Sequence, residues 1–89
     1  MSILEIIQLR LAGKPPGDLC EQIKESIAAN EEVAAKVAVF RRDGLDTDIA
    51  IHIYHDETPD SGSATLGLQL ASELKANGLV QHTFWKQLK

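Results

Sequence analysis

Hydrophobic and polar positions alternate at the beginning of the chain, over residues 2–12. One parity carries most of the apolar side chains, namely Ile3, Ile7, Leu9 and Leu11. Alternation with a period of two, together with β-branched side chains, predicts a β-strand. The Gly-Lys-Pro-Pro-Gly run at 13–17 ends this strand, because proline lacks a backbone donor and glycine permits a turn.

A first amphipathic helix is predicted from Asp18 to about Asn30. Its apolar residues recur every four positions, as the buried stripe of a helix does; they are Leu19, Ile23 and Ile27. Asp18 is expected to cap this helix, with Glu21 three residues later completing an acidic capping box.

A second helix is predicted over residues 63–77, with an apolar stripe of Leu66, Leu70 and Leu74. Gly67 and Ala71 lie beside the stripe, and their small size would let the helix approach a sheet closely. Asn77-Gly78 predicts the helix end, with Gly78 in a left-handed conformation.

Three further strands are predicted over residues 36–42, 49–55 and 79–85. The polar turn at 43–48 is short, so the first two of these form an antiparallel hairpin. In the last strand, Val80, His82 and Phe84 share one face and Gln81, Thr83 and Trp85 share the other. Which of these faces is buried stays open.

The elements follow the order βαββαβ in a single domain, residues 1–89. Two βαβ units joined through a hairpin predict a ferredoxin-like α+β sandwich. Right-handed crossovers then give a four-stranded antiparallel sheet of order 4-1-3-2, with two helices on one face. The other face has no covering element, and its predicted members are Leu4, Ile6, Gln8, Arg10, Ala38, Phe40, Arg42, Ala50, His52 and Tyr54.

Composition excludes several classes of protein. The chain of 89 residues is 44% hydrophobic and 25% charged, which is typical of a globular domain. Its net charge of −4 argues against nucleic-acid binding. Cys20 is the single cysteine and has no partner for an internal disulfide, which favours a cytoplasmic location. The first apolar run is too short and too polar for a membrane span or signal segment.

Three features spread over nearly the whole chain resemble a known superfamily. They are the Pro16-Gly17 turn after the first strand, the Arg41-Arg42 pair before a polar turn, and the group Tyr54, Asp56 and Glu57 at the end of the third strand. On these features the chain resembles the dimeric α+β barrel superfamily, which includes antibiotic-biosynthesis-monooxygenase-like and stress-responsive barrel proteins. The resemblance implies a homodimer through the open sheet face, with any active site between sheet and helices or inside the barrel.

Metal and haem sites lack support in the sequence. His52 and His55 lie three residues apart on a strand, so they point to opposite faces, and no HxH, CxxC or HExxH spacing occurs. The haem-degrading members of the resembled superfamily use an Asn on strand one, a Trp near the end of strand three and a His on the second helix. This chain has Gln8, Tyr54 and no helical His. We therefore expect neither a metal nor a cofactor.

Other reactive residues have simple structural interpretations. Cys20 is expected to be a small buried residue beside Leu19 and Ile23. Asp43, Asp46 and Asp48 lack the glycine and the distal glutamate of a calcium-binding loop, so we expect solvated turn carboxylates.

Two functions are compatible with these patterns. The first is a small homodimeric α+β barrel protein that binds a small apolar ligand between its sheet and its partner. The second is a cofactor-independent oxygenase or isomerase that uses His52 or Tyr54 inside the barrel. We favour the first, because the residue spacing assembles no acid–base constellation.

The candidate site consists of Arg10, His52 and Tyr54, with His82 as a weaker fourth member. Parity places the first three on the same open face, and the first and third strands are neighbours in this fold. A histidine could act as a base, a phenol as a donor, and an arginine could hold an anionic oxygen. The alternative is that these groups form hydrogen bonds across the dimer interface and set its register.

Overall fold

The computed structural model describes residues 3–13, 18–29, 36–44, 47–55 and 65–88. The Pro-Gly turn at 16–17, Asp46 and the acidic pair at 56–57, each singled out from the sequence, lie outside these residues. No helix in the described part is long and apolar enough to cross a membrane.

Four strands and two α-helices follow one another in the predicted order. Their bounds are β1 Ile3–Leu11, α1 Leu19–Ala28, β2 Val37–Arg41, β3 Asp48–His55, α3 Thr65–Leu74 and β4 Gly78–Lys86, with a 3-10 turn at Lys75–Asn77 before β4. The strands form one antiparallel sheet of order β2-β3-β1-β4. This is the predicted 4-1-3-2 order viewed from the other edge, so the ferredoxin-like α+β fold is confirmed.

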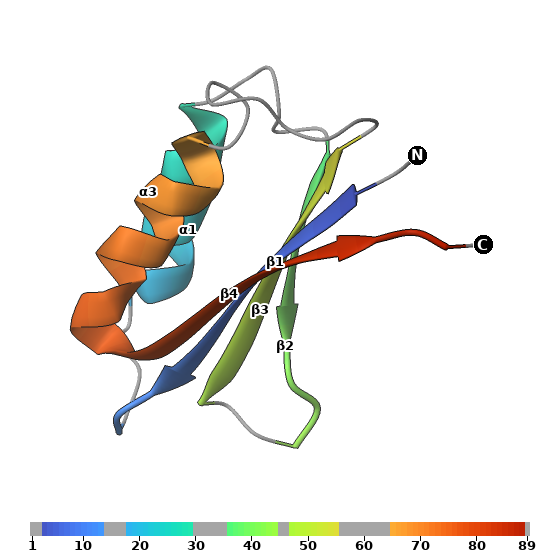
Figure 1. Cartoon of the computed structure of the whole chain (residues 1–89). Helices are drawn as coiled ribbons and strands as arrows, with labels where there is room; N and C mark the ends of the chain where they lie inside the picture. The colour runs from blue at the N-terminus through green and yellow to red at the C-terminus, as the bar shows by residue number, and fades with distance from the viewer. Residues whose placement is uncertain (1–2, 14–17, 30–35, 45–46, 56–64, 89) are drawn as a thin grey trace.

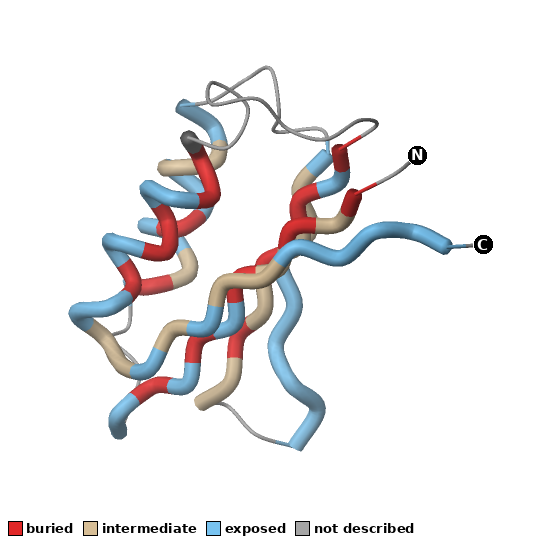
Figure 2. Tube along the Cα trace, in the orientation of Figure 1, coloured by how far each residue is buried: buried red, intermediate tan, exposed pale blue. Residues whose placement is uncertain are grey.

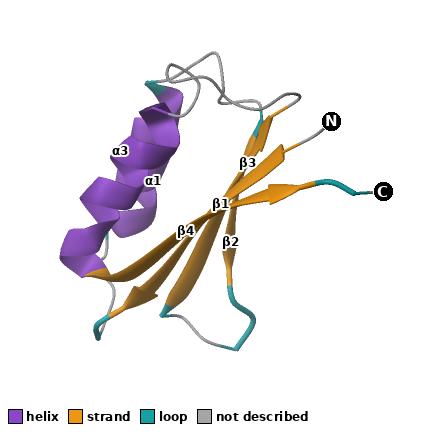
Figure 3. Cartoon of the chain, viewed as in Figure 1, coloured by secondary structure: helices purple, strands orange, loops and turns teal. Residues whose placement is uncertain are grey.

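Both helices cover the same face of the sheet, and no described element covers the opposite face (Figures 1 and 3). We call the uncovered side the open face. Figure 2 shows buried and less buried positions alternating along β1, while the second half of β2 and the end of β4 are exposed. In the described residues, the fold therefore has one helix-covered core and one uncovered sheet face.

The core lies between the sheet and the two helices. Ile7 and Ile51 face each other across β1 and β3, and both are fully buried. The predicted stripe of α3 packs here too, since Leu66, Leu70 and Leu74 are at most 3% exposed. Burying each such side chain contributes about 1.5–3 kcal/mol, which makes this layer the main source of stability.

The capping box predicted for α1 does not form. The helix begins at Leu19, and the Asp18 side chain caps no backbone N–H group. Its carboxylate instead accepts a hydrogen bond of 2.9 Å from the side chain of Gln22. Asp18 has φ −103° and ψ 6°, outside the extended region that lets an N-cap side chain reach back to the helix.

The backbone conformation of Gly78 also differs from the predicted one. It has φ 162°, which is extended backbone, and it is the first residue of β4. A Cβ atom at this position would lie 2.1 Å from the carbonyl oxygen of Arg10 on β1. Glycine is needed at position 78 because two backbones approach closely, whereas a left-handed turn plays no part.

Candidate functional site

The open face carries an unusual amount of exposed apolar and aromatic surface for one small domain. Strand pairing places Leu4 between Tyr54 and Trp85, and Ile6 between His52 and Thr83. Four large side chains of the open face are 48–76% exposed, namely Phe40, Tyr54, Leu79 and Trp85. Such patches mark binding surfaces, because monomers rarely leave so much contiguous apolar area in water.

The predicted residues Arg10, His52 and Tyr54 all lie on the open face but do not form one cluster. Arg10 pairs with Asp48, whereas His52 pairs with Ile6, four residues away along β1. At about 3.3 Å per residue, the two positions are separated by roughly 13 Å. His52 instead packs its ring on Phe40, with centroids 4.8 Å apart. The open face therefore has an aromatic end and an arginine end.

The arginine end centres on Asp48. Its Oδ1 lies 3.4 Å from Nε of Arg10, and its Oδ2 lies 3.2 Å from Nη1 of Arg42. The side chain of Asp48 is only 18% exposed, so the predicted solvated turn carboxylate is wrong for this residue. Desolvation acts to raise the pKa of Asp48, but the hydrogen bonds from Arg42 and Arg10 outweigh it and lower that pKa below its ordinary value.

A depression of about 600 Å³ lies at this arginine end. Its lining combines cationic, amide and apolar residues from all four strands: Gln8, Leu9, Arg10, Phe40, Arg41, Arg42, Asp48, Ile49, Ala50, Leu79, Val80 and Gln81. His52 and Tyr54 are not among them. The volume is within the range of small-molecule sites.

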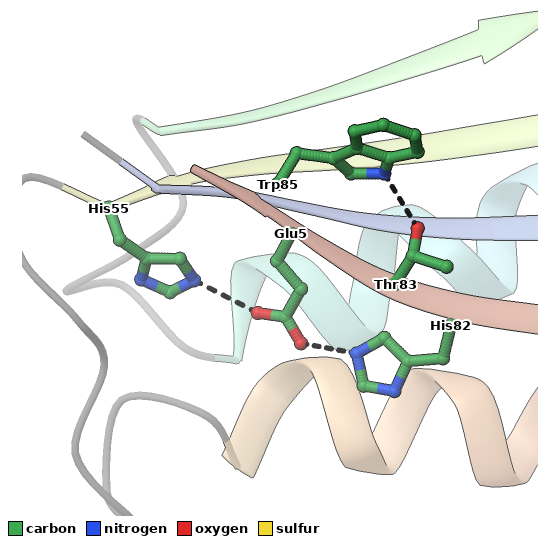
Figure 4. A network of polar contacts seen from close by, with 5 residues as sticks. All are labelled: Glu5, His55, His82, Thr83 and Trp85. Atoms are coloured by element: carbon green, nitrogen blue, oxygen red, sulfur yellow. Dashed lines mark hydrogen bonds and ion pairs between the residues drawn. The ribbon is translucent and has the colours of Figure 1, made fainter. Parts of the chain in front are cut away.

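A second polar constellation lies on the helix-covered side of the sheet. Glu5 is fully buried, and its two carboxylate oxygens contact different histidines. Oε1 lies 2.9 Å from Nε2 of His55, and Oε2 lies 2.6 Å from Nε2 of His82. Figure 4 shows the carboxylate between the two imidazoles, with β1, β3 and β4 each supplying one residue.

The hydrogen-bond roles in this network depend on the tautomers of the two histidines. A carboxylate without a proton can only accept, so in that form of Glu5 each histidine donates from Nε2. In a neutral imidazole this tautomer leaves Nδ1 with a lone pair. The carboxyl–imidazole pairing orients each ring, as a carboxylate that contacts a histidine does in many functional sites.

Helix α3 makes room for the carboxylate at Gly67. A Cβ atom at position 67 would lie 1.7 Å from Oε2 and 2.5 Å from Cδ of Glu5. The prediction that Gly67 allows close approach is confirmed, although the group beneath it is a buried glutamate and not an apolar surface.

His82 therefore does not belong with the other candidate residues. Its partner across β1 is Ile7, whose side chain is in the core, so His82 faces the helices. Its grouping with Arg10, His52 and Tyr54 is wrong, because β4 is phased with Val80 and His82 inward. His55 likewise faces the helices, as expected from its three-residue spacing from His52.

Sequence reasoning missed Glu5, although a signal was present. Glu5 occupies the same parity as Ile3 and Ile7 in β1, and it is the one charged residue on that buried side. A charge among buried positions indicates either a partner or a function.

The network is not arranged for metal binding. The two imidazoles approach different oxygens of one carboxylate (Figure 4). In the part of the chain that the structure describes, no three potential ligands are placed to hold one metal ion.

Cys20 is half-buried, so the buried position predicted for it is wrong, and its Sγ lies 3.5 Å from Nη2 of Arg41. Arg41 is on the helix side of β2, opposite Ile49.

Comparison with known proteins shows the fold. No protein-family model and no curated protein matches the chain. Among solved structures, it is similar to a variant of SnoaB, described as a cofactor-independent oxygenase from Streptomyces nogalater. The superposition has a TM-score of 0.67 and covers 99% of this chain and 94% of the other, at 11% sequence identity. The chain has the ferredoxin-like α+β fold of SnoaB. This likeness agrees with the resemblance inferred from the sequence and extends to the fold alone.

Proposed function

We propose that the chain forms a homodimer through its open face and binds a small, largely apolar ligand between the two sheets. The observation that carries this proposal is the uncovered face itself, where four large side chains are 48–76% exposed. A second copy presents the same face with the same twist, so two sheets can pack with their side chains interdigitated, about 10 Å apart.

Trp85 supports burial of this face. Its indole N–H donates a hydrogen bond of 2.9 Å to the hydroxyl of Thr83 in the same strand (Figure 4). The polar atom of the indole is thus satisfied before any partner arrives. Covering the ring would therefore gain apolar burial without leaving an unpaired donor.

The dimer is tested by light scattering at micromolar concentration. We expect twice the chain mass for the unmodified protein and the chain mass for Leu4→Asp, which places a charge between Tyr54 and Trp85. The matched control is Leu68→Asp on α3, a 59% exposed leucine on the other side of the molecule, and it should remain dimeric. A monomer for the unmodified protein would overturn the proposal.

Ligand binding is tested with the neutral fluorescent probe N-phenyl-1-naphthylamine. Its fluorescence should rise with the unmodified dimer and with Leu68→Asp, and should be lost with Leu4→Asp. The variant His52→Ala should stay dimeric and bind the probe at least several-fold more weakly. A large loss of stability in His52→Ala with unchanged probe binding would instead mean that His52 sets the dimer register.

A second candidate function is proton-transfer chemistry of the kind an isomerase or a cofactor-independent oxygenase needs. It is favoured by the buried Glu5 and by His82, whose side chain is 17% exposed next to the half-exposed ring of Phe84. In this role His82 would take a proton at Nδ1 from an acidic C–H or O–H group, and the Glu5 carboxylate would stabilise the imidazolium. SnoaB, which has the same fold, is described as a cofactor-independent oxygenase, so O₂ is the co-substrate that we propose for the resulting carbanion or phenolate.

This second function is tested with a panel of phenols and 1,3-diketones. Deuterium incorporation from D₂O and O₂ uptake are the two readouts. We expect His82→Gln to reduce either activity by about 100-fold or more, while the open-face variant His52→Ala keeps it. Activity that survives His82→Gln would exclude His82 as the base.

A further inference from the structure

The depression at the arginine end has a charge opposite to that of the whole chain. Among the described lining residues, the charged side chains on the open face are Arg10 and Arg42 against Asp48, so their formal charge is +1. The chain as a whole carries −4. An isolated positive site on an acidic protein attracts anions locally while the remaining surface repels them.

The arginines keep unused donors toward this depression. Among the described contacts, Arg10 reaches Asp48 only through Nε, and Arg42 reaches it through Nη1. The two side chains are 66% and 59% exposed. Each guanidinium has five N–H donors, and a shared carboxylate cannot satisfy both groups. The fork of each arginine is therefore available to a further carboxylate or sulfonate.

The neighbouring row of the open face is suited to a flat ring. Strand pairing aligns Gln81, Gln8, Ala50 and Phe40 in one row across the sheet, with Arg10 and Asp48 in the next row along β1 and β3. Ala50 leaves a low position between Gln8 and Phe40. A planar ligand lying over Ala50 would contact the Phe40 ring and extend its polar end toward Arg10.

Dimerisation through the open face would make the binding of an anion at the arginine end more favourable. In the described strands, Asp48 is the one carboxylate on the open face, so the strands of a second copy offer no unpaired acid to neutralise these arginines. Covering the depression would place uncompensated positive charge in a region of low dielectric constant, which is costly. A bound anion would remove that cost.

We propose that the arginine end of the open face binds the acidic group of a small, flat aromatic anion, with Arg10 and Arg42 as the ligands of its carboxylate or sulfonate. This inference rests on the proposed ligand-binding dimer and names the chemical class of its ligand. Ligands of the same shape without a negative charge should bind less tightly.

The experiment compares two probes with the same ring system. 1-Anilinonaphthalene-8-sulfonate carries a negative charge, and N-phenyl-1-naphthylamine is its neutral counterpart. Fluorescence titration of the unmodified dimer should give about 10-fold tighter binding of the sulfonate. Raising the salt concentration should weaken binding of the sulfonate and leave the neutral probe unchanged.

Arginine variants then locate the effect. Arg10→Gln with Arg42→Gln should weaken sulfonate binding by about 10-fold or more and alter neutral-probe binding by less than about two-fold. The control Lys24→Gln removes an exposed cation from α1, on the other face, and should change neither affinity. Light scattering must show that every variant keeps the oligomeric state of the unmodified protein.

The outcomes separate this inference from the proposed function. Equal affinity of the unmodified dimer for both probes, or equal loss of both in the arginine variant, overturns the anion site but leaves the ligand-binding dimer intact. Failure of the unmodified dimer to bind either probe overturns both.

Discussion

Replacing Gly67 by alanine tests whether the buried Glu5 network holds its position as rigidly as the structure indicates. The added Cβ would lie 1.7 Å from Oε2 of Glu5, so the carboxylate must move. Glu5 is fully buried and held on both oxygens. We therefore expect this movement to break the hydrogen bond to His82 and to leave the buried carboxyl group with fewer partners.

The expected cost follows from two opposing terms. Breaking a buried carboxylate–histidine pair costs about 3–5 kcal/mol, because the buried group that remains loses its partner. Alanine is about 1 kcal/mol better than glycine inside a helix. The net destabilisation of Gly67→Ala should thus be about 2–4 kcal/mol. For a domain of 89 residues, this is a large fraction of the total free energy of unfolding.

Urea unfolding followed by circular dichroism measures this free energy, at one fixed protein concentration because a dimer's stability depends on it. The decisive control is the same substitution in a Glu5→Ala background. With the carboxylate absent, Gly67→Ala should stabilise the chain by about 0.5–1 kcal/mol through helix propensity alone.

The sign of the effect should thus reverse between the two backgrounds. If Gly67→Ala destabilises both by the same amount, the clash is with the sheet backbone and not with the carboxylate. If it stabilises both, Glu5 can turn aside without loss, and the network is not rigid.

Three further outcomes are expected. Gly78→Ala should prevent folding or destabilise more than Gly67→Ala, as judged by circular dichroism, because the atom 2.1 Å away belongs to the backbone of Arg10 and cannot turn aside. The pKa of Asp48 is lowered in the folded chain, so the ionised carboxylate should stabilise the fold at pH values above the ordinary pKa of 3.8, and this stabilisation should be lost as the pH falls below 3.8. In Asp48→Asn, the free energy of unfolding measured with urea should change less over this acidic range. Glu5→Gln should cost about 1–3 kcal/mol in the same assay, less than Glu5→Ala, because the amide still fills the space and keeps one acceptor.

The candidate site shows where sequence reasoning succeeds and where it does not. Parity along β1 and β3 correctly placed Arg10, His52 and Tyr54 on the open face. Parity says nothing about position along the strand, so it could not show that Arg10 lies near Asp48 and far from His52. Only the register decides which residues meet, and the register depends on pairing between distant segments.

The phase of β4 is a second example. Its two faces are Val80, His82 and Phe84 against Gln81, Thr83 and Trp85, and both contain apolar and polar residues. No local pattern selects between them. Pairing of His82 with Ile7 and packing against α3 settle the question, because Glu5 offers His82 a buried acceptor on that side.

The order of elements, the two helical stripes and the alternation of the central strands are local properties. They follow from the period of two or about four residues between apolar positions, which a chain displays before it folds. The Glu5 network, the arginine depression and the close approaches at Gly67 and Gly78 join residues up to 77 positions apart. These features exist only when strands β1, β3 and β4 are aligned, because tertiary packing alone determines which buried charge meets which partner.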